Sequence, residues 1–348
     1  MTNRKKIKVL IVDDSATARE YLRYIISRDE ELEVAGAARN GFEAVELVQV
    51  KRPDVITMDI QMPRMDGYEA TRKIMELYPV PIVIISSQVI PEQVQNTFRA
   101  IKAGAVAALE KPKGPSHSES GRMAEKIVQT IKLMSEVKVI KRFPTNRKTE
   151  ICPRVPAHRG SIRMIAIGAS TGGPPVIQAI LSNLVKNIPV PILIVQHIAP
   201  GFLHGMVEWM SKETGFPIKV GVHGDRTVAG HVYFAPDGFH MGVTREGGIF
   251  LAQSSPENGL RPSVSYLFRS TSKSYGRRSA GILLTGMGRD GARELKEMKD
   301  LGSLTIAQDK ESSIVHGMPG EAIKMDAADH ILPPEKIAEF LNQTVIWK

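Results

Sequence analysis

A serine follows a short apolar run near the middle of the chain. Residues 164–167 lead into Gly168, Ala169 and Ser170, and Thr171, two glycines and two prolines come next. An apolar run, a set of small residues and then proline indicate a buried strand, a tight turn and a helix N-terminus. At that place Ser170 could help bind an anion, or be a nucleophile next to helix N–H groups that are free to bind the oxyanion of an intermediate. The remaining alternative is a serine that caps the helix.

A histidine and an aspartate follow two other apolar runs in the same half of the chain. His197 ends one run, and Asp290 follows another within a glycine-rich loop. Parallel strands present their carboxyl ends at one edge of a sheet, so both residues are expected close to Ser170. A serine, an imidazole that takes its proton and a carboxylate that orients the imidazole form a nucleophilic triad. The sequence therefore predicts Ser170, His197 and Asp290 as catalytic residues.

The choice of the carboxylate rests on the loop around it. Asp309 also follows an apolar run, so the strand ends alone leave Asp290 and Asp309 as alternatives. We favour Asp290 because the glycines around it allow the backbone to approach a substrate closely. Residues 168–173 lack the lysine of a P-loop and the glycine spacing of a dinucleotide fingerprint, which argues against nucleotide binding there.

Three acidic residues near the start of the chain also follow apolar runs. Asp13 and Asp14 follow residues 7–12, and Asp59 follows residues 55–58. Clustered carboxylates repel one another unless a cation lies between them, and a set of oxygen ligands favours Mg²⁺. A metal-bridged aspartate can accept a phosphoryl group. The pattern predicts a Mg²⁺ site at Asp13, Asp14 and Asp59.

Two further polar residues lie at the ends of the next apolar runs. Ser86 follows residues 82–85, and Lys111 comes shortly after residues 106–109. A hydroxyl and an ammonium at these places can pair with the oxygens of a new phosphate. Ser86 and Lys111 are therefore predicted to contact a phosphate on Asp59.

The first part of the chain alternates strand-like and helix-like patterns. Five apolar runs alternate with five amphipathic segments, which predicts an open parallel sheet covered on both faces. We assign residues 1–136 to this doubly wound, flavodoxin-like α/β domain. The expected segments are 7–12, 16–28, 32–37, 41–50, 55–58, 68–78, 82–85, 91–103, 106–109 and 124–137.

The last part of the chain predicts a second and larger α/β domain, residues 161–348. Its strand-like runs are again separated by helix-like segments, which indicates a mainly parallel doubly wound sheet. The exception is the stretch 218–252. Short strands broken by glycine suggest an antiparallel hairpin inserted in that sheet, at 232–235, 241–244 and 248–251.

The net charge of +9 is concentrated between the two domains. Residues 137–163 are strongly basic and hold a single glutamate, so the remainder of the chain is close to neutral. Residues 137–160 also carry prolines and little periodicity, which predicts a basic linker, with an acidic binding partner as the alternative. No basic recognition helix follows this segment, so nucleic-acid binding is not expected.

The first domain contains, in this order, the motifs VLIVDDSATAR, ITMDIQMPRMDGYEA, PIVIISS and LEKP. In these motifs and their order it resembles the receiver domain of bacterial two-component response regulators. The resemblance implies that a histidine kinase phosphorylates Asp59 and that Asp13 and Asp14 hold Mg²⁺. It also implies that Ser86 is the switch hydroxyl and Lys111 the invariant lysine.

The second domain contains the motifs IAIGASTGGPPVI, ILIVQHIAPGF, GHVYFAPDGFHM, RPSVSYLF, GILLTGMGRDGA and IAQDKESSIVHGMPGEAI. In these motifs it resembles the catalytic domain of the CheB family, the chemotaxis response-regulator methylesterases. The resemblance implies that Ser170, His197 and Asp290 are the triad, with Thr171 beside the site and a Met287 N–H suited to the oxyanion. It implies hydrolysis of glutamate γ-methyl esters on the cytoplasmic helices of chemoreceptors, deamidation of particular glutamines, and no cofactor in this domain.

One position departs from the receiver pattern. Three residues before Lys111, Ala108 stands where many receivers carry an aromatic that swings on activation. An aromatic rotamer switch is therefore not expected. The hypothesis that remains is that the unphosphorylated receiver covers the esterase edge and that phosphorylation loosens this packing.

The composition bounds the partners and the location. Cys152 is the only cysteine, and no apolar run reaches the about 18 residues that a membrane span needs. We expect a cytoplasmic monomer with no disulfide and no membrane insertion, whose partners are a chemoreceptor and a chemotaxis histidine kinase. The residues leave two alternatives open, a receptor-binding scaffold without catalysis and an esterase of small molecules.

Overall fold

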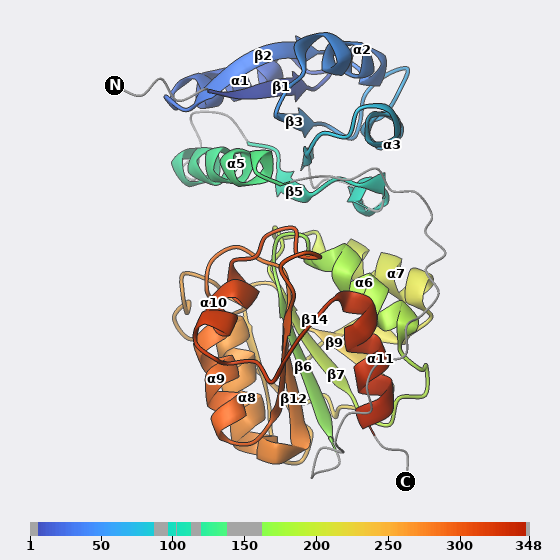
Figure 1. Cartoon of the computed structure of the whole chain (residues 1–348), viewed down its shortest axis with the longest axis vertical. Helices are drawn as coiled ribbons and strands as arrows, with labels where there is room; N and C mark the ends of the chain where they lie inside the picture. Colours follow the sequence, from blue (N-terminus) through green and yellow to red (C-terminus); the bar gives the residue numbers. More distant parts are fainter. Residues whose placement is uncertain (1–5, 87–96, 102, 113–119, 138–161, 346–348) are drawn as a thin grey trace. The chain divides into compact units, whose positions relative to one another are not determined.

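The computed structural model describes residues 6–86, 97–101, 103–112, 120–137 and 162–345 (Figure 1). The chain divides into two compact units, residues 1–150 and 151–348, and each is described by itself. The predicted linker, 137–160, lies outside the described residues except for Val137.

The first unit is built on a five-stranded sheet in the order β2-β1-β3-β4-β5, and all four strand pairs are parallel. This is the flavodoxin-like order, as predicted. Every residue of β3 and β4 is buried, which explains their unbroken apolar runs. The elements are β1 (Ile7–Val12), α1 (Ala16–Ser27), β2 (Leu32–Ala38), α2 (Gly41–Lys51), β3 (Val55–Met58), α3 (Gly67–Leu77), β4 (Ile82–Ser86), β5 (Ala107–Glu110) and α5 (Ser120–Ser135), and residues 97–101 are also helical.

The second unit is built on a seven-stranded parallel sheet in the order β14-β13-β12-β6-β7-β9-β8. Helices α8, α9 and α10 cover one face, and α6, α7 and α11 cover the other (Figure 1). The elements are β6 (Met164–Ala169), α6 (Gly173–Asn183), β7 (Ile192–Gln196), α7 (Leu203–Thr214), β8 (Ile218–Val220), β9 (Val232–Phe234), β10 (His240–Val243), β11 (Ile249–Ala252), α8 (Val264–Tyr275), η1 (Gly276–Arg278), β12 (Ser279–Leu283), α9 (Ala292–Asp300), β13 (Leu304–Gln308), α10 (Met318–Lys324), β14 (His330–Leu332) and α11 (Pro334–Thr344).

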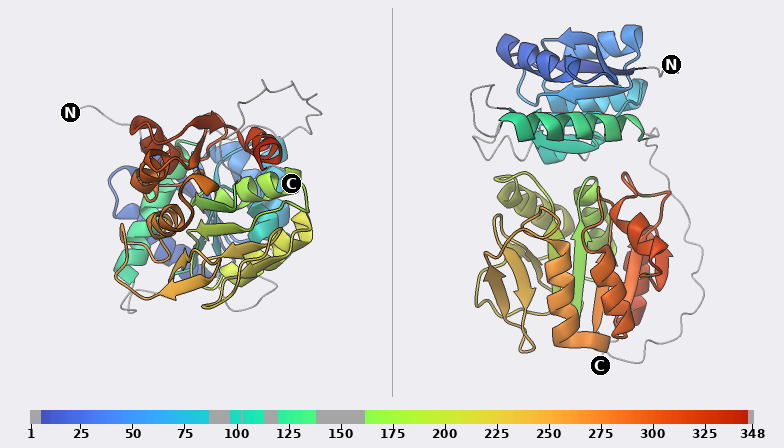
Figure 2. Two further views of the ribbon diagram at one scale, coloured as in Figure 1. Left: turned by 90° about the horizontal axis from the view of Figure 1, so that it is seen from below. Right: turned by 90° about the vertical axis from the view of Figure 1, so that its left-hand side faces the viewer.

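The antiparallel hairpin is present, but it is not inserted in the main sheet as expected. β10 and β11 pair with each other and form a separate two-stranded sheet, visible beside the main sheet in Figure 2. The segment 232–235, which the sequence grouped with them, is β9, and it pairs in parallel with β7 and β8. The short apolar runs did not distinguish these pairings, because β9 and β10 are both fully buried.

Strand order fixes where a ligand can bind in each unit. In the second sheet the chain runs outward from β6 toward β7 on one side and from β12 toward β13 on the other. The helices that follow these two neighbouring strands therefore diverge and leave a crevice beyond their carboxyl ends. In the first sheet β1 and β3 meet in the same way.

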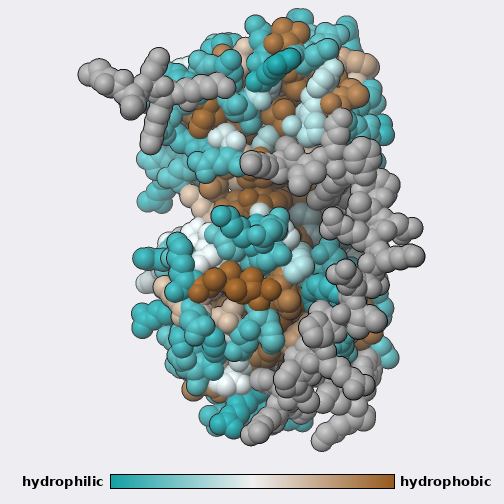
Figure 3. Space-filling view, in the orientation of Figure 1, coloured by the Kyte–Doolittle hydropathy of each residue, from teal (hydrophilic) through white to brown (hydrophobic). Residues whose placement is uncertain are grey.

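The surface is mainly hydrophilic, with scattered apolar side chains (Figure 3). In the second unit these include Leu301, Met325 and Ile331, each about half exposed. Single exposed apolar side chains are ordinary for globular proteins. None of the helices in the described part of the chain is long and apolar enough to cross a membrane.

Candidate phosphorylation site and esterase active site

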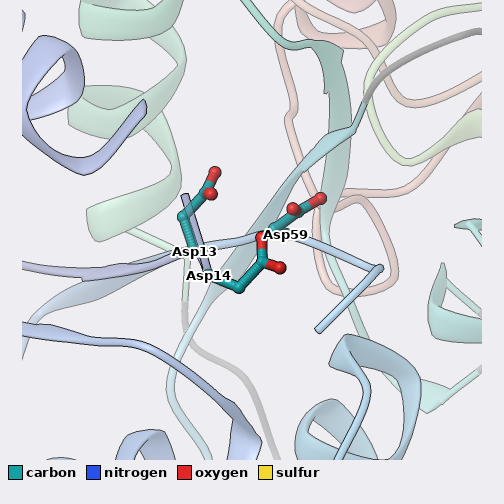
Figure 4. Close-up of side chains that lie close together, drawn as sticks. All are labelled: Asp13, Asp14 and Asp59. Atoms are coloured by element: carbon teal, nitrogen blue, oxygen red, sulfur yellow. The ribbon is translucent and has the colours of Figure 1, made fainter. Parts of the chain in front are cut away.

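Three carboxylates meet at the crevice of the first sheet (Figure 4). Asp13 and Asp14 follow β1, and Asp59 follows β3. One oxygen from each lies within 4.8 Å of the other two, so a single cation can contact all three. The donors are carboxylate oxygens only, which suits a hard cation such as Mg²⁺.

Lys111 contacts two of these carboxylates. Its Nζ lies 2.7 Å from Asp13 Oδ2 and 2.8 Å from Asp59 Oδ2. Burial raises the pKa of Asp59, and the Lys111 ammonium only partly opposes this. Burial lowers the pKa of Lys111, but the two carboxylates outweigh it and raise that pKa overall. The ammonium thus reduces the repulsion between two buried acids.

Ser86 ends the next strand of the sheet. It is 2 % exposed, and its carbonyl accepts a hydrogen bond of 2.9 Å from the Lys111 N–H. Because β4 pairs with β3, Ser86 and Asp59 leave neighbouring strands on the same edge. Ser86, Lys111 and the three acids therefore come from the four strand ends that the sequence predicted.

A close backbone approach fixes the strand end at Asp59. Gly67 opens α3, and its N–H donates to Ile60 O at 2.9 Å. A Cβ at this position would lie 2.0 Å from Asp59 O, so only glycine fits without a shift of the backbone that follows β3.

Replacing Gly67 with alanine should therefore destabilise the first unit by at least about 2 kcal/mol, because the added methyl overlaps a backbone oxygen. Scanning calorimetry of the whole chain would measure this. Gly121→Ala in α5 is the matched control, since a Cβ there meets nothing within 4 Å. Equal transition temperatures for the two variants would contradict the prediction.

Ser170 lies at the crevice of the second sheet, directly after β6. Its carbonyl accepts the Gly173 N–H at 2.9 Å, and Gly172 has φ 79° and ψ 0°. These values define a type II turn, whose third residue needs the left-handed conformation that glycine adopts without strain. The N-cap of α6 is Gly172, and no side chain caps this helix. Ser170 is therefore not the helix cap that was the alternative interpretation.

His197 and Asp290 lie side by side, and His197 leaves the sheet on the strand next to that of Ser170. β6 and β7 pair with Ala169 opposite Gln196, so Ser170 and His197 leave neighbouring strands at one level. His197 Nε2 lies 3.0 Å from Asp290 Oδ2, which is a hydrogen-bond distance. The imidazole is 10 % exposed and the carboxylate 1 % exposed.

Asp290 accepts hydrogen bonds from four groups, and His197 Nε2 lies 3.0 Å from its Oδ2. Together they place its carboxylate at the N-terminus of α8, where a negative charge is favoured. Burial raises the pKa of Asp290, but His197 and the serine donors outweigh it and hold this pKa well below its ordinary value. The donors are Asn258 Nδ2 (3.0 Å), Ser263 Oγ (2.8 Å), Val264 N–H (2.6 Å) and Ser265 N–H (3.2 Å).

The other candidate carboxylate has a local role. Asp309 Oδ1 accepts the Ser312 N–H at 3.1 Å and so holds its own loop after β13. Within the described residues, Asp290 is the aspartate that lies beside His197.

The loop after β12 passes directly against Ser170. The Ser170 N–H donates to Thr285 O at 3.0 Å, and a Cβ on Gly286 would lie 2.7 Å from the Ser170 Cβ. Thr285 Oγ1 donates to Thr171 O at 2.9 Å, which fixes the turn from its other side. Met287 follows in the same loop with 44 % of its surface exposed. Thr171 thus follows the serine directly, and Met287 follows Gly286 in the loop that lies against it.

Sequence reasoning missed several residues that hold the site together. Three of the donors to Asp290 come from Ser263, Val264 and Ser265 at the start of α8, and the sequence did not single them out. A serine directly before an amphipathic segment is a signal for a helix N-terminus that could have found them. Gln196 was also missed. Its signal is a polar residue that closes a buried strand directly before His197.

Comparisons with known proteins agree with both units. The CheB methylesterase profile matches residues 165–341, and the response regulator receiver domain profile matches residues 9–119. The crystal structure of the Thermotoga maritima CheB methylesterase catalytic domain is 36% identical, with a TM-score of 0.51. That match covers 53% of this chain and 98% of the other.

Relatives are similar along the whole chain. A protein of Geobacter metallireducens named protein-glutamate methylesterase/protein-glutamine glutaminase 4 is 52% identical over 98% of this chain and 100% of its own length. One of Syntrophus aciditrophicus, named protein-glutamate methylesterase/protein-glutamine glutaminase 1, is 52% identical over 96% and 97%. The chain therefore belongs to the CheB methylesterase family and carries a response regulator receiver domain in its first part.

Proposed function

We propose that this chain hydrolyses glutamate γ-methyl esters on chemoreceptors through Ser170, His197 and Asp290. The observation that carries the proposal is the buried Asp290 carboxylate, which faces His197 Nε2 at 3.0 Å next to the strand end of Ser170. Full-length relatives named protein-glutamate methylesterases support the substrate class. If the substrate is the cytoplasmic helices of a chemoreceptor, the chain acts in the cytoplasm. We propose that it acts there as a monomer, without nucleic acid and without insertion into the membrane.

The contact with Asp290 decides which nitrogen of His197 acts as the base. With the Nε2 proton held by Asp290, Nδ1 is the unprotonated nitrogen. Nδ1 takes the proton of the Ser170 hydroxyl as its oxygen attacks the ester carbonyl. The same proton then passes to the departing methoxide, which leaves as methanol. A water molecule then attacks the acyl-enzyme with the same proton transfers. This frees the receptor, whose side chain is now glutamate, and restores the Ser170 hydroxyl.

Asp290 stays ionised throughout this cycle. A carboxylate with a lowered pKa, four hydrogen-bond donors and the His197 ring beside it does not take the imidazole proton. Its work is to hold the tautomer of His197 and to stabilise the imidazolium that forms after proton transfer.

The oxyanion would be bound by backbone N–H groups. We assign this role to the Met287 N–H in the loop that passes against Ser170, with Thr171 beside the site. Each such donor contributes about 10²–10³-fold in rate. The same machinery serves deamidation, in which a glutamine amide replaces the ester and ammonia leaves instead of methanol.

The receiver would regulate this reaction. Asp13, Asp14 and Asp59 would hold Mg²⁺, and the ion would supply positive charge for phosphoryl transfer from a chemotaxis histidine kinase to Asp59. Lys111 and the Ser86 hydroxyl would then pair with the phosphate oxygens. No cofactor is required by the triad of the second unit.

Methanol release from a methylated chemoreceptor tests the proposal. We expect release by the full chain, and several-fold faster release with Mg²⁺ and a small phosphodonor. Asp59→Asn should keep the basal rate and lose this stimulation, and chelation of Mg²⁺ should do the same. A receptor that is bound but never demethylated would indicate a scaffold instead, and equal activity on small esters would indicate an unspecific esterase.

A further inference from the structure

A buried glutamine joins the two catalytic strand ends of the second unit. Gln196 is the last residue of β7 and is 4 % exposed. Its Nε2 donates hydrogen bonds of 2.8 Å to both Ser170 O and His197 O. A single amide therefore bridges the main chains of the residues assigned as nucleophile and base.

The surroundings fix the direction of this amide. The two acceptors near Nε2 are carbonyl oxygens, so the reversed amide would place Oε1 against two other acceptors. On the opposite side, a Cβ on Gly173 would lie 2.0 Å from Oε1. The amide is thus enclosed between the Ser170 turn and the first residue of α6.

The arrangement carries an energetic cost that packing alone does not explain. Gln196 Oε1 is buried and has no hydrogen-bond partner among the described residues. A buried acceptor without a partner costs free energy of folding, and an apolar side chain would complete the run of β7 without that cost. The same amide that leaves Oε1 without a partner makes two good hydrogen bonds through Nε2. Both acceptors are main-chain oxygens of the site, Ser170 O and His197 O.

We propose that Gln196 is a positioning residue, whose amide sets the distance and orientation between the Ser170 hydroxyl and the His197 imidazole. This inference rests on the proposed triad. A misplacement of about 1 Å between reacting groups can cost about 10²-fold in rate. Because Gln196 is buried behind the strand ends, its loss acts on the chemical step and not on binding of the ester.

The test replaces Gln196 with methionine, which keeps the length of the side chain and removes both donors. We expect kcat for methanol release to fall about 10–100-fold, with KM changed by less than about threefold. The rate at which a fluorophosphonate labels Ser170 should fall in parallel. A loss carried by KM would overturn the proposal.

Two further variants separate positioning from general destabilisation. Gln196→Asn keeps an amide that is one methylene shorter, so it should lose less kcat than Gln196→Met and it carries the test if the methionine variant does not fold. Thr305 lies on β13 of the same sheet, and Thr305→Val removes a partly buried hydrogen bond of 2.9 Å to Asp329 and the acceptor of the Asp329 N–H. It should lower the melting temperature and leave kcat within about twofold. An equal kcat loss in Thr305→Val and Gln196→Met would overturn the positioning role.

The labelling step distinguishes this inference from the proposed function. If wild type is labelled at Ser170 and Gln196→Met is labelled equally fast, the triad stands and the role of Gln196 is wrong. If the reagent does not label Ser170 in the wild-type chain, the triad itself is wrong, and the positioning role is wrong with it.

Discussion

Replacing Ser170 with alanine is expected to lower methanol release by about 10⁴–10⁶-fold while the chain still folds. Removal of a catalytic serine has this effect because the other two triad residues act only through it. The fold should survive because the Ser170 side chain neither caps α6 nor makes a hydrogen bond within the described residues. Methanol release under saturating receptor measures the loss.

The folding of the Ser170→Ala variant can be measured in the same samples, and a second serine variant serves as the control. Trp209 is buried in the second unit and the first unit has no tryptophan, so tryptophan fluorescence reports the unfolding of the second unit. Ser182→Ala, on the exposed end of α6, is the matched serine control and should keep full activity. Retained activity in Ser170→Ala would mean that another group attacks the ester.

Much of the fold follows from local pattern. The strands of both sheets are short apolar runs that end in small or polar residues, and helices separate them, so a parallel α/β class could be predicted. The hairpin placement could not. β9, β10 and β11 are three- or four-residue strands, and which partner each one takes depends on contacts with β7 and α8 that are distant in sequence.

The residues of the second-unit site also fall into those that the sequence could predict and those that it could not. The strand-end rule brings together Ser170 and His197, because parallel pairing places neighbouring ends at one level. Asp290 is different, because it lies seven residues beyond the end of β12 and its position depends on donors from the start of α8. Sequence spacing does not reveal that contact, which explains why Asp309 remained an alternative. Gln196 was hidden for a related reason, since its function depends on two main-chain oxygens.

Replacing Asp290 with asparagine is expected to lower the rate of methanol release by about 10³–10⁴-fold. Asparagine keeps one oxygen, so its NH₂ group must face either the Val264 N–H or the donors on the other oxygen. With NH₂ next to His197, Nε2 becomes the acceptor and the ring proton moves to Nδ1. The imidazole then presents a proton to Ser170 instead of taking one. Methanol release across pH 6–9 checks this, and we expect no recovery at any pH.

The same substitution has a signature in stability. The pKa of Asp290 is lowered in the folded chain, so its ionised form stabilises the fold above about pH 4, and that contribution is lost as pH falls toward the folded pKa. The difference in unfolding free energy between wild type and Asp290→Asn should be largest at pH 7 and shrink below about pH 4. Urea titrations followed by tryptophan fluorescence would measure it. Ser263→Ala, which removes one donor and keeps the charge, should retain the wild-type dependence on pH and most of the activity. A stability difference that stays constant from pH 7 to pH 3 would show that the hydrogen bonds of Asp290 do not lower its pKa. The assignment of the His197 tautomer to an ionised Asp290 would then be wrong.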